Sequence, residues 1–207
     1  MQKVRIAVLV SGGGTNLQAL IDEIEKGGIN GEIVLVMSDR EGAYALTRAQ
    51  KHGIKAVTVC RKSYNDREAF NNAMLQELRE VNAEFIVLGG FLSIFTSSFV
   101  KEYEGRIINV HPALIPAFCG NGFYGDRVHK AVIEYGVKVS GATVHFVDEG
   151  TDSGPIILQE VIAVAEDDTY ESLAAKVLKL EHKLLPEAVK LYCDGKLRIE
   201  GRKVRIR

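Results

Sequence analysis

Two polar residues stand at the end of the apolar stretch "GRIINVHPALIP" (residues 105–116). Asn109 and His111 are two positions apart, so on a strand their side chains point to the same face. Histidine changes charge near neutral pH, and a side-chain amide can donate to a developing oxyanion without titrating. The pair therefore suits acyl transfer. The alternative is an amide that bonds the backbone at the strand end, beside an ordinary half-buried histidine.

A third candidate, Asp152, lies in a Thr-Asp-Ser-Gly turn between two predicted strands. Aspartate in such a turn commonly bonds its own backbone. A carboxylate that reached His111 would instead orient the imidazole and stabilise its charged form. The order Asn109, His111, Asp152 matches no serine hydrolase, and no serine sits in a nucleophile elbow. We therefore expect the substrate to supply the attacking group, as an amine.

The glycine loop "SGGGTNLQAL" (residues 11–20) joins the first predicted strand to the first predicted helix. Backbone N–H groups at such a junction can bind a phosphate. A dinucleotide fingerprint would need glycine where Leu17 stands, and a Walker loop would need a Gly-Lys-Ser/Thr triplet that the chain lacks. The candidate ligand that remains is a simple phosphate monoester, which Gly14, Thr15 and Asn16 would hold. The alternative is a tight turn with Thr15 as helix N-cap.

These residues need elements to position them, and the sequence predicts an alternation of buried strands and amphipathic helices. Strands apolar on both faces, separated by helical segments, indicate βαβ units and a doubly wound, mostly parallel α/β sheet flanked by helices. We expect one domain over residues 1–207, with a short terminal hairpin at about 196–207. Strands are predicted at 4–10, 32–38, 55–60, 85–90, 106–109, 138–147 and 154–164, and helices at 17–28, 43–53, 65–81, 127–135 and 167–193, the last capped by Asp168 or Thr169.

Composition narrows the function classes. The 207 residues include 26 Lys+Arg and 27 Asp+Glu, so no basic excess favours nucleic-acid binding. No apolar run reaches the roughly 18 residues of a membrane helix, and no signal pattern precedes the first strand. Three widely spaced cysteines form no CxxC pair, which favours reduced thiols, no metal site and a cytoplasmic protein. The cysteines are Cys60, Cys119 and Cys193.

Four motifs together resemble the phosphoribosylglycinamide formyltransferases of purine synthesis: "VLVSGGGTNLQAL", "IVLGGFLSI", "GRIINVHPALIP" and "GATVHFVDEGTDSGPIILQ". The resemblance runs in order from about Val4 to Cys193. It implies a Rossmann-like formyltransferase fold, with a phosphate-binding N-terminal half and a folate-binding, catalytic C-terminal half. It also implies transfer of the formyl group of the co-substrate 10-formyltetrahydrofolate to the amine of 5'-phosphoribosylglycinamide (GAR), with no metal and no covalent enzyme intermediate.

The resemblance also implies roles for matched positions. Asn109 and His111 would stabilise the oxyanion and assist proton movement, and Asp152 would orient His111 or a water and help remove the amine proton. Glu181 would contact the ribose and glycinamide end of the substrate. The phosphate would be held by Gly14, Thr15 and Asn16, and folate would be bound by Arg67, Leu92, Ser93, Ile94, Asp148 and Glu149.

The chain departs from the family pattern at two places. After "HPALIP" it reads "AFCGNGFYG" (Ala117–Gly125) where many members have Lys-Tyr-Pro-Gly-Leu-His, which leaves the roles of this loop and of His129 open. Ser93 replaces an arginine that the fourth-strand motif often carries, which could alter folate affinity.

Several alternatives share part of this pattern. A methionyl-tRNA formyltransferase needs a further C-terminal domain and a basic surface, and a formyltetrahydrofolate hydrolase normally carries an extra N-terminal domain. A formyltransferase for another amine, or a binding module for a phosphate ligand, would also have the glycine loop, but the binding module leaves Asn109, His111 and Asp152 unexplained. We expect small-molecule partners, no nucleic acid, no membrane, and a monomer or homodimer.

Overall fold

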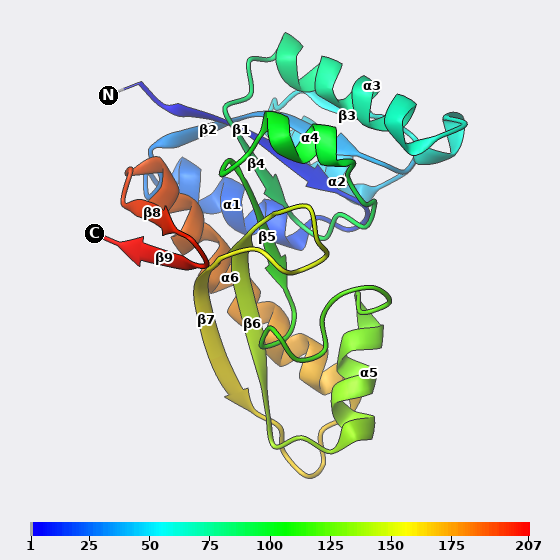
Figure 1. Ribbon diagram of the computed structural model, residues 1–207, viewed down its shortest axis with the longest axis vertical. Helices are drawn as coiled ribbons and strands as arrows, with labels where there is room; N and C mark the ends of the chain where they lie inside the picture. Colours follow the sequence, from blue (N-terminus) through cyan, green and yellow to red (C-terminus); the bar gives the residue numbers. More distant parts are fainter. Residues whose placement is uncertain (1) are drawn as a thin grey trace.

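The computed structural model describes residues 2–207, and its centre is one nine-stranded sheet in the order β3-β2-β1-β4-β5-β6-β7-β9-β8 (Figure 1). Strands β1 to β5 pair in parallel, β6 and β7 continue the sheet antiparallel, and the β8–β9 hairpin joins β7 through β9. The strands are β1 (Val4–Val10), β2 (Gly31–Ser38), β3 (Ala56–Thr58), β4 (Phe85–Leu88), β5 (Ile107–His111), β6 (Val139–Phe146), β7 (Ile156–Ala163), β8 (Leu197–Glu200) and β9 (Lys203–Ile206).

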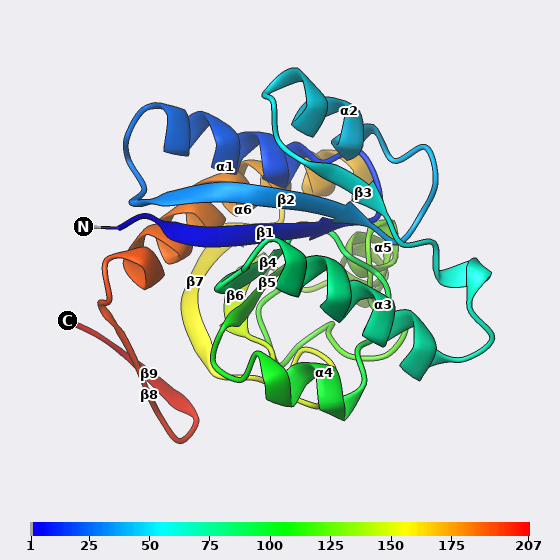
Figure 2. The same cartoon turned by 90° about the horizontal axis from the view of Figure 1, so that it is seen from above.

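Helices cover both faces of the sheet, so its central strands are apolar on both sides. Figure 2 shows α1, α2 and α6 on one face and α3 and α4 on the other. Each face has its own cluster of buried side chains. This arrangement confirms the predicted doubly wound, mostly parallel α/β fold. The helices are α1 (Thr15–Glu25), α2 (Tyr44–Lys51), α3 (Arg67–Glu80), α4 (Ser97–Glu102), α5 (Asp126–Tyr135) and α6 (Tyr170–Cys193).

The strand order places a ligand crevice at the carboxyl ends of β1 and β4. The chain runs outward from β1 through β2 to β3 and then returns to β4 on the other side of β1. Loops that leave β1 and β4 in opposite directions open a crevice at such a switch point. Here the two loops are also tied together, because Ser11 N–H donates to Gly90 O (3.1 Å) and Leu92 N–H donates to Ser11 Oγ (2.9 Å).

The antiparallel pairing of β5 with β6 decides which side chains lie beside the candidate residues of β5. Asn109 lies opposite His145, and His111 lies opposite Thr143. Strands β6 and β7 run side by side below the parallel strands in Figure 1, and α6 packs against both. The register therefore brings a second histidine to the same end of the sheet.

The observed elements differ from the predicted ones mainly at their ends. Helix α3 begins at Arg67 because Asp66 caps it, with Asp66 Oδ1 accepting from Ala69 N–H (2.7 Å). Helix α4 has six residues, too few to show a helical period in the sequence. Across residues 2–207, every helix is too short or too polar to span a lipid bilayer.

Candidate active site

The three candidate catalytic side chains meet at the carboxyl end of β5. Asp152, in the loop between β6 and β7, places Oδ2 3.5 Å from His111 Nδ1 and Oδ1 3.4 Å from Asn109 Nδ2. Its backbone is left-handed, with φ +55°, a conformation that aspartate tolerates better than most residues. The turn thus directs the carboxylate toward the strand end, where it accepts from Asn109 Nδ2 and Gly120 N–H, both outside its own turn.

His145 is a fourth polar group in this cluster and was not identified from the sequence. Its Nδ1 lies 2.8 Å from Phe146 O, which makes Nδ1 the donor and leaves Nε2 as an acceptor in the neutral ring. Nε2 lies 3.3 Å from Asn109 Nδ2 and 3.7 Å from Asp152 Oδ1. The one available signal was a lone histidine in an apolar strand just before the Asp152 turn.

The Asn109 amide is held only loosely. Its Nδ2 contacts His145 and Asp152 at 3.3 and 3.4 Å, both longer than a typical N–H···O hydrogen bond. Each of its two N–H donors can therefore exchange a long protein contact for a shorter one to a ligand oxygen. An amide in this state can serve a developing oxyanion.

His111 is buried, and both of its ring nitrogens face acceptors. Nε2 lies 2.8 Å from Phe118 O and therefore carries a proton, while Nδ1 faces Asp152. Burial lowers the pKa of His111, and the nearby Asp152 carboxylate and the Phe118 carbonyl oppose that effect without cancelling it. A proton at Nδ1 would face the carboxylate directly, so Asp152 and the Phe118 carbonyl favour the charged ring that burial opposes.

Asp152 is charged despite its burial. Burial alone would raise its pKa, but a proton on the facing nitrogen of His145 or His111, together with the Gly120 N–H, lowers it below the ordinary value. Gly120 N–H donates to Asp152 Oδ2 at 3.0 Å. The site therefore contains a carboxylate that is ionised at neutral pH.

The loop Ala117–Gly125 supplies backbone groups to this cluster. Phe118 has φ +50° and Gly120 has φ +88°, and these left-handed conformations direct the Phe118 carbonyl at His111 and the Gly120 N–H at Asp152. The loop therefore contacts two of the three candidate catalytic side chains.

The cluster lines a cavity of about 630 Å³ at the carboxyl end of the sheet. Of the residues predicted to bind folate, Leu92, Ser93, Ile94, Asp148 and Glu149 line this cavity. Arg67 does not; it is exposed at the start of α3. Arg67 therefore lies outside the cavity wall, and its contact with folate stays a prediction.

Glu181 lines the same cavity from α6 and is bonded to the glycine loop. Asn16 Nδ2 donates to Glu181 Oε2 at 2.7 Å, and both side chains are buried. Burial raises the pKa of Glu181 to about 7, and the hydrogen bond from Asn16 only partly opposes this rise. The side chain of Asn16 therefore faces Glu181, which places the glycine loop beside the α6 wall of the cavity.

The glycine loop has the backbone that a phosphate site needs. Gly14 is the N-cap of α1 with φ +72°, and no side chain caps the N–H groups of the first turn. An added Cβ at Gly14 would lie 2.5 Å from Ala45 Cβ, so only glycine fits. Arg48 fixes the loop from α2, with Nε donating to Gly13 O at 2.9 Å.

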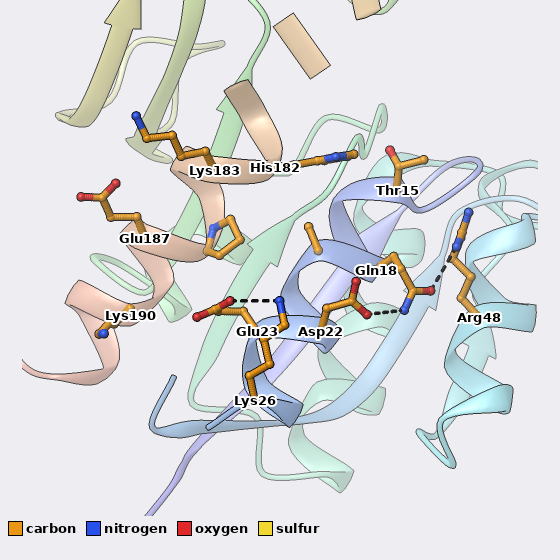
Figure 3. A pocket seen from close by; sticks show the side chains of 12 residues that line it. Thr15, Gln18, Asp22, Glu23, Lys26, Arg48, His182, Lys183, Glu187 and Lys190 are labelled. Atoms are coloured by element: carbon orange, nitrogen blue, oxygen red, sulfur yellow. Dashed lines mark hydrogen bonds and ion pairs between the residues drawn. The ribbon is translucent and has the colours of Figure 1, made fainter. Parts of the chain in front are cut away.

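Thr15 lies at the edge of a second, open groove between α1 and α6. Figure 3 shows Thr15, Gln18 and Arg48 on one side of this groove and His182 and Lys183 on the other. Arg48 Nη1 donates to Gln18 Oε1 at 3.0 Å. Thr15 therefore faces away from the catalytic cluster, and a phosphate contact from it would come through its backbone or from this groove.

His129 is also close to the cluster. It is 5% exposed on α5, lines the cavity, and its buried Nδ1 has no hydrogen-bond partner within residues 2–207. Burial lowers its pKa. Within the same residues, no group of three or more His, Cys, Asp or Glu side chains is arranged to hold a metal ion.

Comparisons with known proteins give consistent similarities. A family model described as formyl transferase matches residues 4–189. The chain is 43% identical over 197 residues to the trifunctional purine biosynthetic protein adenosine-3 of Gallus gallus, which covers 95% of this chain but only 19% of that protein. It is 36% identical to the chloroplastic phosphoribosylglycinamide formyltransferase of Arabidopsis thaliana, covering 95% of this chain and 68% of that protein.

A solved structure is also similar throughout. Glycinamide ribonucleotide transformylase 1 from Symbiobacterium toebii superposes with a TM-score of 0.94 at 42% identity, covering 99% of this chain and 94% of that one.

Proposed function

The chain belongs to the formyl transferase family, and on that premise we propose that it transfers the formyl group of 10-formyltetrahydrofolate to the amine of GAR. The observation that carries this proposal is the cluster of Asn109, His111 and Asp152 at the wall of one cavity, with a phosphate-binding loop beside it. The cluster offers an oxyanion donor, a proton acceptor and no protein nucleophile, which suits attack by a substrate amine.

The proposed reaction balances as follows. The neutral amine attacks the formyl carbon, a new N–C bond forms, and the carbonyl electron pair moves to oxygen. The attacking nitrogen then loses a proton, the oxygen's electron pair re-forms the C=O bond as the bond from the formyl carbon to the folate nitrogen breaks, and that nitrogen takes a proton. The products are the formylated amide and deformylated folate, with no oxidant or reductant required.

Each residue has a proposed part in this sequence. Asn109 Nδ2 exchanges its long contacts for the developing oxyanion. Asp152, ionised at neutral pH, accepts the proton from the nitrogen, directly or through water. Asp152 orients His111, whose Nδ1 lies 3.5 Å from Oδ2, and a ring protonated at Nδ1 can assist proton movement and stabilise the oxyanion.

The two ends of the cavity suit two substrates. The phosphoribosyl half of GAR would lie at the end formed by Glu181 and the glycine loop, with Gly14, Thr15 and Asn16 offering backbone N–H groups. Folate would occupy the end lined by Leu92, Ser93 and Ile94. We also propose that the protein is cytoplasmic and is a monomer or a homodimer.

The test is a turnover assay with purified protein, GAR and 10-formyltetrahydrofolate, following deformylated folate by absorbance and omitting each substrate in turn. We expect turnover that requires both substrates and needs neither ATP nor added metal. Deformylation that ignores GAR would indicate a hydrolase. Absence of turnover would refute the proposal and favour another amine acceptor or a binding module.

A further inference from the structure

One side chain in the cavity wall has no part in the reaction described above. Arg40 is the single Lys or Arg among the described residues that line the cavity, whereas the same wall carries five carboxylates. It follows β2 and therefore lies at the carboxyl end of the sheet, where the ligand crevice opens. The carboxylates are Asp126, Asp148, Glu149, Asp152 and Glu181.

A buried carboxylate holds Arg40 beside the loop that follows β4. Asp39 is 5% exposed, and its Oδ2 accepts from Ser93 Oγ at 2.6 Å. Its other oxygen, Oδ1, lies 3.8 Å from Arg40 Nε and has no hydrogen-bond partner within residues 2–207. Asp39 therefore fixes Ser93 with one oxygen and attracts the guanidinium with the other.

The guanidinium keeps most of its donors free. Arginine has five N–H donors, and a 3.8 Å ion pair is too long to occupy any of them as a hydrogen bond. Other carboxylates of the wall are already engaged. Asp148 accepts from Ser153 Oγ (2.6 Å), and Glu149 accepts from Ser97 Oγ (2.9 Å). Arg40 is thus available to an anion that enters the cavity.

The position of Arg40 indicates which ligand it meets. Glu181 and the glycine loop form the wall on the face of the sheet that α1 and α6 cover. Arg40 is linked through Asp39 to the 91–95 loop, whose Phe91 and Phe95 pack against the cluster on the opposite face. Arg40 therefore lies across the sheet edge from the end that we assign to GAR.

We propose that Arg40 recognises the glutamate carboxylates of the folate co-substrate, an inference that rests on the proposed function. A folate ends in an aminobenzoyl ring followed by glutamate. Beside Arg40, Leu92 and Ile94 are 40% and 47% exposed and offer apolar surface for a ring. A planar guanidinium binds a carboxylate through two parallel hydrogen bonds. Arg40 is thus a specificity-determining residue, not a catalytic one.

The experiment compares two co-substrates in the wild-type protein and in Arg40→Ala. One is 10-formyltetrahydrofolate, and the other is the same molecule with a neutral methylamide in place of glutamate. We expect Arg40→Ala to raise KM for the glutamate form about 5- to 20-fold, since the site is partly exposed, with kcat unchanged. KM for the methylamide form and KM for GAR should stay within about twofold of wild type.

Arg198→Ala is the matched control, because Arg198 is similarly exposed, lies on the β8–β9 hairpin and pairs with Glu200 at 3.4 Å. It should change neither KM. An equal rise for both folates, a rise confined to GAR, or no rise for the glutamate form would each overturn the assignment of Arg40.

Calorimetric binding of the two folates separates this proposal from the proposed function. If the wild-type protein binds both folates but does not turn over GAR, the proposed function fails. The assignment of Arg40 is then supported if Arg40→Ala weakens binding of the glutamate form alone, and it is overturned if binding of that form is unchanged or if both forms are weakened equally.

Discussion

Asp152→Asn is the substitution that tests the candidate site most directly. Asparagine is nearly the same size as aspartate and can still accept the Gly120 N–H with its oxygen. It cannot accept a proton from the substrate nitrogen, and its NH2 group would face the Asn109 Nδ2 donor, from which the carboxylate now accepts. The change therefore removes the proton acceptor while keeping most of the shape of the site.

The expected loss follows from the role. Proton transfer by a positioned side chain contributes about 10²–10⁴ in rate, or about 3–5 kcal/mol in the barrier. We therefore expect kcat to fall by that factor, with KM for each substrate within about threefold of wild type, because Asp152 is not assigned to binding either substrate. Loss of charge-assisted hydrogen bonds should also cost about 1–3 kcal/mol of stability.

The pH dependence of this stability difference has a definite sign. The pKa of Asp152 is lower in the folded protein than in the unfolded chain. Its stabilising contribution is thus fully present above the unfolded value near 4 and is lost as pH falls through the depressed folded value. Thermal unfolding of wild type and Asp152→Asn should differ most above pH 5 and converge in acid.

The assay is initial-rate turnover at pH 7 under saturating substrates, with thermal unfolding to verify that the variant is folded. Asp194→Asn serves as the control, since Asp194 is the C-cap of α6 and pairs with Lys196 at 3.2 Å. Its kcat should stay within about twofold of wild type. A folded Asp152→Asn protein that retains more than a tenth of wild-type kcat would refute the reasoning.

Three further changes test other parts of the site. Asn109→Ala removes the proposed oxyanion donor and should lower kcat by about 10²–10³, measured in the same turnover assay; a loss below tenfold counts against that role. Gly14→Ala places a Cβ 2.5 Å from Ala45 Cβ in a backbone with φ +72°. It should therefore lower the unfolding free energy by about 1–3 kcal/mol and raise KM for GAR. Wild-type values of both quantities would contradict this prediction. Glu181 has a pKa raised to about 7 by burial, so the folded protein loses stability as pH rises from about 4.5 to 7; Glu181→Gln should abolish this loss, worth up to about 3 kcal/mol, and parallel stability curves for the two proteins between pH 5 and 8 would exclude it.

The parts of the site that were predictable depend on local rules. Alternation along a strand placed Asn109 and His111 on one face, and buried apolar runs located β1, β4 and β5. The carboxyl end of a parallel sheet then indicated where ligands bind. Asp152 could be nominated because its turn lies between two strongly patterned strands. These inferences require no knowledge of contacts between distant segments.

The parts that were missed depend on long-range geometry. His145 faces Asn109 only because β6 pairs antiparallel with β5 in one register, which neither strand's own pattern encodes. The bond from the Asn16 side chain to Glu181, 165 positions away, also joins segments that no local pattern relates. Arg40 follows a strand in a segment with no motif, and its place in the cavity depends on the contact between Asp39 and Ser93.

The loop Ala117–Gly125 explains how an unusual sequence can still build this site. Its two contributions, the Phe118 carbonyl to His111 and the Gly120 N–H to Asp152, are backbone groups that almost any residue possesses. What the loop must preserve is a left-handed backbone at these positions, which glycine adopts without strain and which Phe118 adopts at some cost. Other side chains at these positions can thus orient the same imidazole and carboxylate, provided that the loop backbone turns in the same place.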